Sequence, residues 1–341
     1  MKVLWLCGSL LWSLMAIASP MDAAQEDFNS SRDISVSKEI QKKSIAMNVY
    51  HVENFAPLLG KSPLPKEGQK AYFLLYQPPK NIRGVLVISP SSEGVRDHLI
   101  GRHVRHFLSM GYAVAVVDSY RMRGHPSVME DQSLISLPEQ VMDLILVVQY
   151  LEKQPTFKGL PIGVFGTSRG GEAIELLLDE RVFKTFGVDT QVIKWACVLY
   201  PAVQIAYEDD SFQPLKIPHL IIIAQKDDRQ SPQLGIEYAE FLHSKNPKLQ
   251  KMVWLDSVHY LDAPFEKTWF PKAISMLHVP VVRVNADGQF IYKKGYFENW
   301  KAVVSFWKPH MSQGVHYGQV NDSHLHVMTV MEQFINVVDG R

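Results

Sequence analysis

The sequence of 341 residues has little cysteine, no surplus of charge of either sign and no apolar run of transmembrane length. Its two cysteines, Cys7 and Cys197, form no C-x-x-C pair and no Cys/His cluster with zinc spacing, which excludes a disulfide framework and a structural zinc site. Lysine plus arginine and aspartate plus glutamate number 35 each, so the chain lacks the basic field that nucleic-acid binding requires. With 46% hydrophobic and 21% charged residues, the sequence predicts an ordinary globular protein that does not bind nucleic acid.

The N-terminal region contains an uncharged apolar run at residues 3–18. This run is shorter than the about 20 residues that a transmembrane helix needs. Ala16 and Ala18 supply the small residues that a signal peptidase reads. We therefore expect residues 1–18 to be a signal peptide, the protein to be periplasmic or secreted, and no stable membrane anchor to remain after cleavage. An uncleaved anchor or a buried helix is the alternative.

The rest of the chain alternates short apolar runs with amphipathic segments. The apolar runs are continuous, as is typical of strands buried on both faces. Expected strands are Ala71–Tyr76, Val85–Ser89, Ala113–Asp118, Ile162–Phe165, Val192–Tyr200, Leu220–Ala224 and Met252–Leu255. Expected helices are Arg96–Met110, Pro138–Lys153, Arg169–Glu180, Pro232–Ser244 and Ser323–Val338. This alternation predicts one α/β domain, residues 46–341, with a mostly parallel sheet covered by helices on both faces. The polar residues 19–45 are expected to form a flexible leader.

Residues 262–321 interrupt the alternation before the last helix. Asp287-Gly288 lies between two β-type runs and predicts a hairpin. The aromatic residues of this insertion are Trp269, Phe290, Tyr292, Tyr296, Phe297, Trp300 and Trp307. These side chains either line an active site as a cap or pack onto the domain surface, and packing is the commoner use of aromatic residues.

A candidate nucleophile lies between an expected strand and an expected helix, in the motif Gly166-Thr167-Ser168-Arg169-Gly170. G-x-S-x-G in this context places the serine hydroxyl at the tip of a strained turn. Glycine is required at both ends of the motif because a side chain there would collide across the turn. The amide of Arg169, at the start of the helix, is expected to donate to an oxyanion. A purely structural turn is the alternative.

A nucleophilic serine requires a histidine base and an acid that orients it. His259 follows the last core strand directly, so its loop opens at the carboxyl edge of the sheet, where Ser168 is expected. Its chain position fits the order serine, acid, histidine that accompanies this motif. His324 and His326 lie on or near the last helix and are weaker candidates.

The acid is expected in the loop after the strand IPHLIIIA, where Asp227 and Asp228 are adjacent. We favour Asp227 because it comes first after the strand, and expect its neighbour to face solvent or to cap the next helix. Asp256 and Asp262 flank the histidine and are alternatives, although loop aspartates are usually solvated.

The second oxyanion amide is expected from the loop after Val85–Ser89, which reads Pro90-Ser91-Ser92-Glu93-Gly94. Its small residues allow the backbone to approach a substrate closely. Ser92 is the favoured donor, and Ser91 is nearly as suitable and is expected to contact substrate.

These motifs resemble those of the dienelactone-hydrolase family of the α/β-hydrolase superfamily over residues 71–262. The matching stretches are GTSRGG, AQKDDRQSP, HYLD and DSYRMRG. The resemblance implies an α/β-hydrolase fold and hydrolysis of an ester or lactone without a metal or organic cofactor, and it again indicates Asp227 as the acid. The namesake enzymes use cysteine where this sequence has Ser168, so the resemblance does not extend to lactone specificity.

Family members also hold a substrate carboxylate with arginines. Arg123, together with Arg121 and His125, is expected either to contact an anionic substrate at the rim of the site or to fix its loop through a salt bridge. His98, His103 and His106 lie along one expected helix and predict surface histidines rather than a metal site.

The sequence therefore predicts a serine hydrolase that cleaves a small carboxylic ester through Ser168, His259 and Asp227. A serine peptidase or acyltransferase on the same triad, or a non-catalytic binding protein on this scaffold, are the alternatives. The oligomeric state is not predicted by any pattern in the sequence.

Overall fold

The structure is a computed structural model, and it describes residues 33–208, 210–247 and 250–340. The predicted signal peptide and residues 19–32 of the predicted leader lie outside this part. Among the described residues, no helix is both long and apolar enough to cross a membrane.

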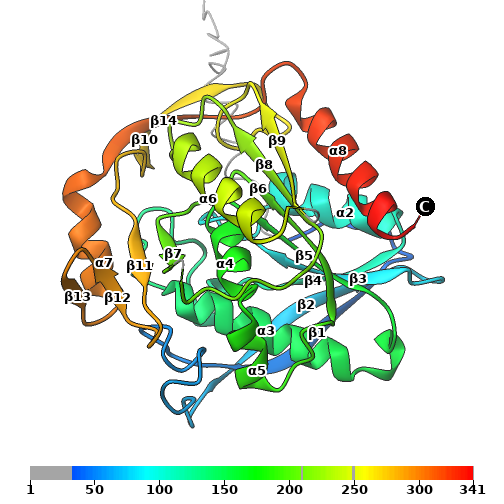
Figure 1. Ribbon diagram of the computed structural model, residues 1–341. Coiled ribbons are helices and arrows are strands. Elements are labelled where there is room, and N and C mark those ends of the chain that lie inside the picture. The colour runs from blue at the N-terminus through cyan, green and yellow to red at the C-terminus, as the bar shows by residue number, and fades with distance from the viewer. Residues whose placement is uncertain (1–32, 209, 248–249, 341) are drawn as a thin grey trace, which may run out of the picture.

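An eight-stranded sheet forms the centre of the molecule, in the order β1-β2-β4-β3-β5-β6-β8-β9 (Figure 1). The strands are β1 (Gln41–Val49), β2 (Gln69–Gln77), β3 (Gly84–Ser89), β4 (Tyr112–Val116), β5 (Ile162–Thr167), β6 (Ile193–Leu199), β8 (His219–Ala224) and β9 (Gln250–Leu255). Strand β2 is antiparallel to β1 and β4, and every other neighbouring pair is parallel. The predicted mostly parallel sheet is confirmed.

Helices cover both faces of this sheet, as predicted. The helices are α2 (Arg102–Ser109), α3 (Leu137–Lys153), α4 (Arg169–Leu177), α5 (Glu180–Phe186), α6 (Pro232–Lys245) and α8 (Ser323–Val338), with a π-helical turn (Asp97–Gly101) before α2 and short 3₁₀ turns at Arg121–Arg123 and Pro155–Phe157. Apolar residues of α3 to α6 pack in one core and those of α2 and α8 in the other.

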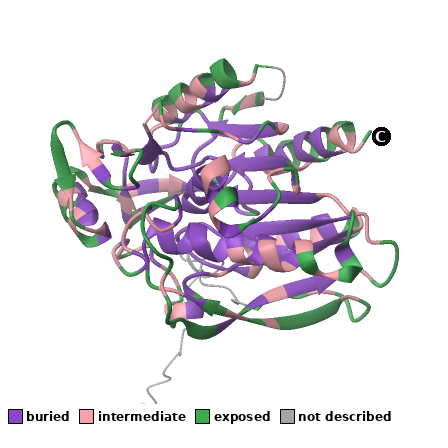
Figure 2. Cartoon of the chain, turned by 60° about the horizontal axis from the view of Figure 1, so that its bottom comes forward, coloured by how far each residue is buried: buried purple, intermediate pink, exposed green. Residues whose placement is uncertain are grey.

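The two cores explain why the strands are continuously apolar. Val85 and Val87 of β3 belong to the core under α3, whereas Leu86 and Ile88 belong to the core under α8. All six residues of β3 are buried, because neither face of the strand meets water. Figure 2 shows this buried centre, with exposed residues at the periphery.

The predicted leader ends earlier than expected, because residues 41–45 belong to β1. This strand pairs antiparallel with β2, and Ile45 lies opposite Phe73. Upstream, Ile34 is only 4% exposed, and the amide of Ser35 donates to Asp97 Oδ1 at 2.9 Å. Strand β1 lies at the edge of the sheet and most of its residues are exposed, so its sequence carries little of the apolar signal on which the prediction relied.

The predicted insertion folds as two small sheets and a helix, on the left of Figure 1. Its elements are β10 (Thr268–Ser275), β11 (Val282–Val284), β12 (Phe290–Tyr292), β13 (Gly295–Phe297), α7 (Trp300–Trp307), a 3₁₀ turn (Lys308–His310) and β14 (Ser312–Tyr317). Strands β10 and β14 pair with each other, whereas β11 joins β7 (Ile205–Tyr207), which follows β6 in the chain. The predicted hairpin is confirmed, since β11 pairs antiparallel with β12 and Gly288 has a φ of +80° in the turn.

Candidate active site

Ser168 lies at the turn between β5 and α4 in a strained backbone conformation. Its φ is 51° and its ψ is −121°, a region that costs a non-glycine residue about 1–3 kcal/mol. Hydrogen bonds hold this conformation: the amide of Ser168 donates to Leu199 O at 3.0 Å, and its carbonyl accepts from the amides of Glu172 and Ala202 at 3.0 and 3.1 Å. The turn therefore fixes the direction of the serine hydroxyl.

The two glycines of the motif allow the chain to pass very close to this turn. A Cβ on Gly166 would lie 2.4 Å from the carbonyl oxygen of Gly170. A Cβ on Gly170 would lie 2.2 Å from Ser89 O and 2.5 Å from Pro90 O. The loop after β3 thus crosses the first turn of α4, which brings the expected oxyanion loop beside the nucleophile.

The structure brings Ser168, His259 and Asp227 into one chain of hydrogen bonds. His259 Nδ1 lies 2.7 Å from Asp227 Oδ2, and His259 Nε2 lies 3.0 Å from Ser168 Oγ. Because a carboxylate only accepts, Nδ1 carries the proton, and Nε2 accepts from the serine hydroxyl. Backbone amides of Arg229 and Gln230 donate to the other oxygen of Asp227 at 2.8 and 2.9 Å and hold the carboxylate in place.

Three tyrosines surround the imidazole of His259. The ring centroids of Tyr200, Tyr260 and Tyr317 lie 4.7, 5.0 and 5.7 Å from that of His259. Burial raises the pKa of the Tyr200 and Tyr260 hydroxyls well above 10 and that of Tyr317 to about 12, so all three stay neutral. Sequence reasoning missed this group, because Tyr200 looks like the end of a strand and Tyr317 lies far along the chain.

The other candidate acids do not face His259. Asp228 accepts from the amide and Nδ1 of His316 at 2.8 and 2.7 Å. Asp256 forms an exposed ion pair with Lys226, at 2.6 Å. His324 and His326 lie in α8.

Asp262 forms its hydrogen bonds in a different buried network, with His103 and Tyr200. Its carboxylate lies 2.6 Å from His103 Nε2 and accepts from the Tyr200 hydroxyl at 2.6 Å. His103 is 2% exposed, so the expectation of a surface histidine was wrong for this residue. Its ring instead packs 4.6 Å from that of Phe165 in the core. The pKa of Asp262 is lowered because the bonds from His103 and Tyr200 outweigh the effect of burial.

Of the two expected oxyanion donors, Arg169 directly follows Ser168 in the chain, and Ser92 belongs to the loop after β3, which passes the first turn of α4 at Gly170. Arg169 is the first residue of α4, so its amide has no partner within the helix. Ser92 is held by its carbonyl, which accepts from the amide of Val128 at 2.8 Å, and by its hydroxyl, which accepts from Gln132 Nε2 at 3.2 Å. Ser91 lies close to one of the tyrosines that surround His259, because its Oγ is 2.9 Å from the hydroxyl of Tyr260.

The side chain of Arg169 holds the loop that precedes α3, and Gln132 of that loop in turn donates to Ser92. Its guanidinium donates to Gln132 Oε1 and to the carbonyl of Ile135, both at 2.5 Å, and lies 5.1 Å from the ring centroid of Trp300. Burial lowers its pKa from 12.5. The Arg169 side chain therefore acts in the scaffold.

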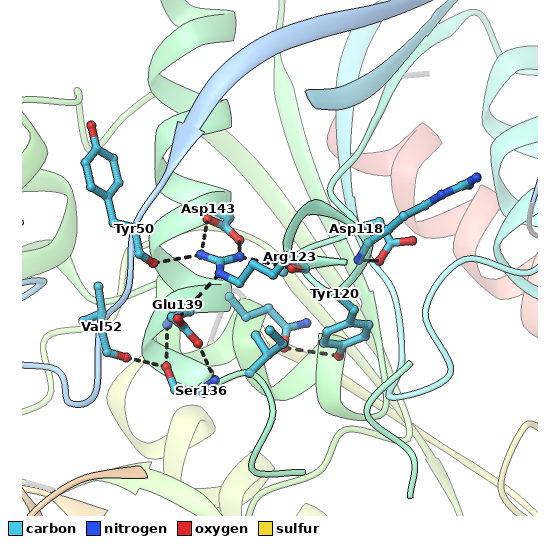
Figure 3. Close-up of polar contacts among 12 residues, drawn as sticks. Tyr50, Val52, Asp118, Tyr120, Arg123, Ser136, Glu139 and Asp143 are labelled. Atoms are coloured by element: carbon cyan, nitrogen blue, oxygen red, sulfur yellow. Dashed lines mark hydrogen bonds and ion pairs between the residues drawn. The ribbon is translucent and has the colours of Figure 1, made fainter. Parts of the chain in front are cut away.

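Arg123 belongs to the scaffold and not to the substrate site (Figure 3). Its guanidinium donates to both carboxylate oxygens of Asp143, at 2.6 and 3.1 Å, and to the carbonyl of Tyr50 at 2.9 Å. Its Nε lies 3.5 Å from Glu139 Oε1. The expected substrate contact of Arg123 is thus corrected: of the two expectations, the structure shows the salt bridge that fixes the loop after β4 to α3. Arg121 pairs with Asp33 at an exposed position.

The insertion borders this site as well as packing on the domain. The hydroxyl of Ser275 donates to Asp228 O at 2.5 Å, and the amide of Met276 donates to Arg229 O at 2.7 Å. On its other side, Trp300 Nε1 donates to Gln132 O at 2.7 Å. Trp300 therefore packs onto the central domain, as the second expectation has it, and a role of the aromatic side chains in lining an active site stays a prediction.

The site offers acid–base and nucleophilic groups. Within the described ranges, no three His, Cys, Asp or Glu side chains are placed to hold a metal ion. Cys197 is buried, and burial raises the pKa of its thiol, so it is not a second nucleophile. The arrangement is suited to attack by a serine hydroxyl on a carbonyl carbon.

The strand order, the serine at the β5–α4 turn, the acid after β8 and the histidine after β9 together constitute an α/β-hydrolase fold. No family model matches the chain, and no curated protein matches it. Solved structures similar to it include a dienelactone hydrolase from Anabaena variabilis ATCC 29413 (17% identity, 64% of this chain and 88% of that chain, TM-score 0.46). Others are carboxyl esterase 2 from Tuber melanosporum (17%, 67% and 81%, 0.46) and an esterase from Pyrococcus furiosus (15%, 68% and 90%, 0.47). All three similarities are distant, with identities of 15–17% and TM-scores of 0.46–0.47.

Proposed function

We propose that this protein is a serine hydrolase that cleaves a small carboxylic ester. The observation that carries the proposal is the continuous hydrogen-bonded chain from Asp227 through His259 to Ser168, at the turn where β5 meets α4. These contacts support the roles of nucleophile, base and orienting acid that we assign to Ser168, His259 and Asp227.

In the first half of the proposed reaction, Ser168 Oγ attacks the ester carbonyl carbon while its proton moves to His259 Nε2. Asp227 stabilises the imidazolium that forms and keeps Nδ1 protonated. The carbonyl oxygen becomes an oxyanion, which accepts from the amides of Arg169 and Ser92. When the tetrahedral intermediate collapses, Nε2 returns the proton to the leaving alcohol, and the acyl group remains on Ser168.

In the second half, water attacks the acyl-enzyme and gives its proton to His259 Nε2. The second tetrahedral intermediate expels Ser168 Oγ, which regains that proton, and the carboxylic acid leaves. Every proton transfer is carried out by His259, so the scheme uses no organic cofactor or metal. Export of the enzyme by a signal peptide at residues 1–18 belongs to the same proposal and rests on the sequence alone.

The test is hydrolysis of p-nitrophenyl acetate by the wild type and by Ser168→Ala. We expect kcat to fall by about 10⁴-fold or more, because removing the nucleophile disables the whole triad. Ser244→Ala, which alters an exposed serine of α6, is the matched control and should retain full activity. Full activity in Ser168→Ala would overturn the proposal. Adding 1-propanol separates a hydrolase from an acyltransferase, which would form more propyl acetate than competition with water allows.

A further inference from the structure

A second buried carboxylate, that of Asp262, follows the proposed base closely in the chain, and its hydrogen bonds run to residues other than His259. Asp262 Oδ1 accepts from the hydroxyl of Tyr200 at 2.6 Å, and Asp262 Oδ2 accepts from Nε2 of His103 at 2.6 Å. The backbone carbonyl of Asp262 accepts from Nη1 of Arg102 at 2.5 Å. The side chains of Asp262 and His103 are only 3% and 2% exposed. Each oxygen of Asp262 is thus held by a donor inside the protein.

A buried carboxylate is a weak source of stability. Its transfer from water into the interior carries a large desolvation penalty, and apolar side chains of similar volume are often as stable. Burial opposes the charged form of Asp262, but the bonds from His103 and Tyr200 outweigh it, so the pKa of Asp262 is lowered. The carboxylate is therefore better explained by the geometry that it fixes than by the stability that it adds.

Tyr200, which donates to Asp262, packs against the base and follows a residue that holds the nucleophile. Its ring lies edge-on to the imidazole of His259, with centroids 4.7 Å apart and planes at 63°. The carbonyl of Leu199, the residue before it, accepts from the amide of Ser168 at 3.0 Å. The bond between Asp262 and Tyr200 therefore ties the loop of His259 to the segment that holds the turn of Ser168.

The backbone of Tyr200 is strained. Its φ is +37°, a left-handed value that is unusual for a bulky side chain. Such a conformation persists only where the surroundings fix it. The amide of Tyr200 donates to the carbonyl of Ile222 at 2.6 Å, and its hydroxyl donates to Asp262. A hydrogen bond to a carboxylate is stronger than one between neutral groups, so Asp262 is well suited to hold the ring in place.

We propose that Asp262 is a positioning residue for the proposed hydrolysis. It holds the Tyr200 ring, and this ring holds the imidazole of His259 in the orientation in which Nε2 lies 3.0 Å from Ser168 Oγ. The inference rests on the proposed function, because Asp262 acts through the base of that reaction. Both Asp262 and Tyr200 act on the orientation of the base rather than on the ester. Loss of their bond should therefore slow the chemical steps and leave substrate binding almost unchanged.

Hydrolysis of p-nitrophenyl acetate by Tyr200→Phe, which deletes only the hydroxyl, tests this inference. We expect kcat to fall by about 10- to 100-fold, because a small misplacement of a reacting group has an effect of this size, and KM to change less than about threefold. The matched control is Tyr207→Phe, which deletes the hydroxyl of another buried tyrosine, bonded to Leu176 O at 3.0 Å, and should leave kcat unchanged. Equal losses of kcat in the two variants would assign the effect to a general loss of stability and would overturn the inference.

Variants of Asp262 test whether the two residues act through one bond. Asp262→Ala should lower kcat about as much as Tyr200→Phe, and the double variant should lose little more, because either change removes the same contact. Asp262→Asn keeps a carbonyl oxygen that can accept from Tyr200 and should recover part of the loss. Additive losses in the double variant, or no recovery in Asp262→Asn, would contradict a role through Tyr200.

Proton NMR separates this inference from the proposed function, because it does not require turnover. The Nδ1 proton of His259, in its 2.7 Å contact with Asp227 Oδ2, should give a low-field resonance in the wild type. This resonance should shift or broaden in Tyr200→Phe and stay unchanged in Tyr207→Phe. Such a result would support the positioning of His259 even if the wild type hydrolysed no ester, which would contradict the proposed function alone. A resonance that is the same in the wild type and both variants would overturn the inference.

Discussion

The central sheet and the segment between β9 and α8 contribute to the site in different ways. In the sheet, strands such as β3, β5 and β8 are buried along their whole length, and each ends at the loop that carries a proposed functional residue. In the segment, β11, β12 and β13 are three residues long, and its contacts with the site come from positions far apart, including Ser275, Trp300 and His316. The comparison indicates that the sheet positions the proposed reacting groups, whereas the segment contacts the loops that carry or adjoin them.

The loop after β8 carries the adjacent residues Asp227 and Asp228 and lies where the two regions meet. One aspartate contacts a residue that follows the sheet, and the other contacts a residue of the segment. Asp227 faces His259, with both side chains almost fully buried. Asp228 faces His316 of β14, and both of these side chains are about one-third exposed. Asp227 thus contacts the proposed base, whereas its neighbour Asp228 attaches the segment.

Replacing each aspartate in turn should give the largest contrast between the two regions, measured as the loss of kcat. Asp227→Asn removes the charge that fixes the His259 tautomer, and kcat for p-nitrophenyl acetate should fall by about 10⁴-fold. Asp228→Asn alters only the contact with the segment, and kcat should fall less than about tenfold. Steady-state kinetics on both variants measure this contrast. Equal losses, or a larger loss in Asp228→Asn, would show that the assignment of the acid is wrong.

Ion pairs of the two regions should differ in their effect on stability. Arg123→Met leaves Asp143 buried without its partner, which should lower the free energy of unfolding by about 3–5 kcal/mol. His316→Gln breaks a pair that is about one-third exposed and should cost less than about 1 kcal/mol. Urea unfolding measures both. Adding Asp143→Leu to Arg123→Met should restore much of the loss, and no recovery would mean that Arg123 acts through other contacts.

A smaller effect, a dependence of stability on pH, is expected from Glu172, which is buried in the first turn of α4. Burial raises its pKa from 4.5 to about 7. Between these values the native state holds the proton more firmly than the unfolded state, so stability should fall as pH rises, by on the order of 3 kcal/mol in total. Urea unfolding at pH 5 and pH 8 should show this decline in the wild type and not in Glu172→Gln. Glu180→Gln, at an exposed ion pair, is the control; a decline that persists in Glu172→Gln would assign it to another group.

The central sheet could be predicted because its signals are local. Continuous apolar runs mark strands that are covered on both faces, and the glycines around Ser168 mark the sharp turn before α4. Edge strand β1 was missed because most of its residues face water, and the helix expected at Arg169–Glu180 ends at Leu177 and is followed by α5. A local pattern of apolar residues therefore predicts a strand that is buried on both faces, but not an edge strand whose residues mostly face water.

The surroundings of the candidate site could not be predicted, because they depend on pairs of distant residues. Arg123 pairs with Asp143 on α3, and Asp228 pairs with His316, 88 positions along the chain. Charge type alone does not reveal which partner a side chain will find after folding.

Covalent labelling tests the central claim, that Ser168 is an activated nucleophile, most directly. The protein is treated with a fluorophosphonate, and the adduct is mapped by peptide mass spectrometry in the wild type, Ser168→Ala and Asp227→Asn. The account predicts a single adduct on Ser168, absent from Ser168→Ala and formed much more slowly in Asp227→Asn. Correctly folded wild-type protein that forms no adduct, or an adduct on another serine, would contradict it.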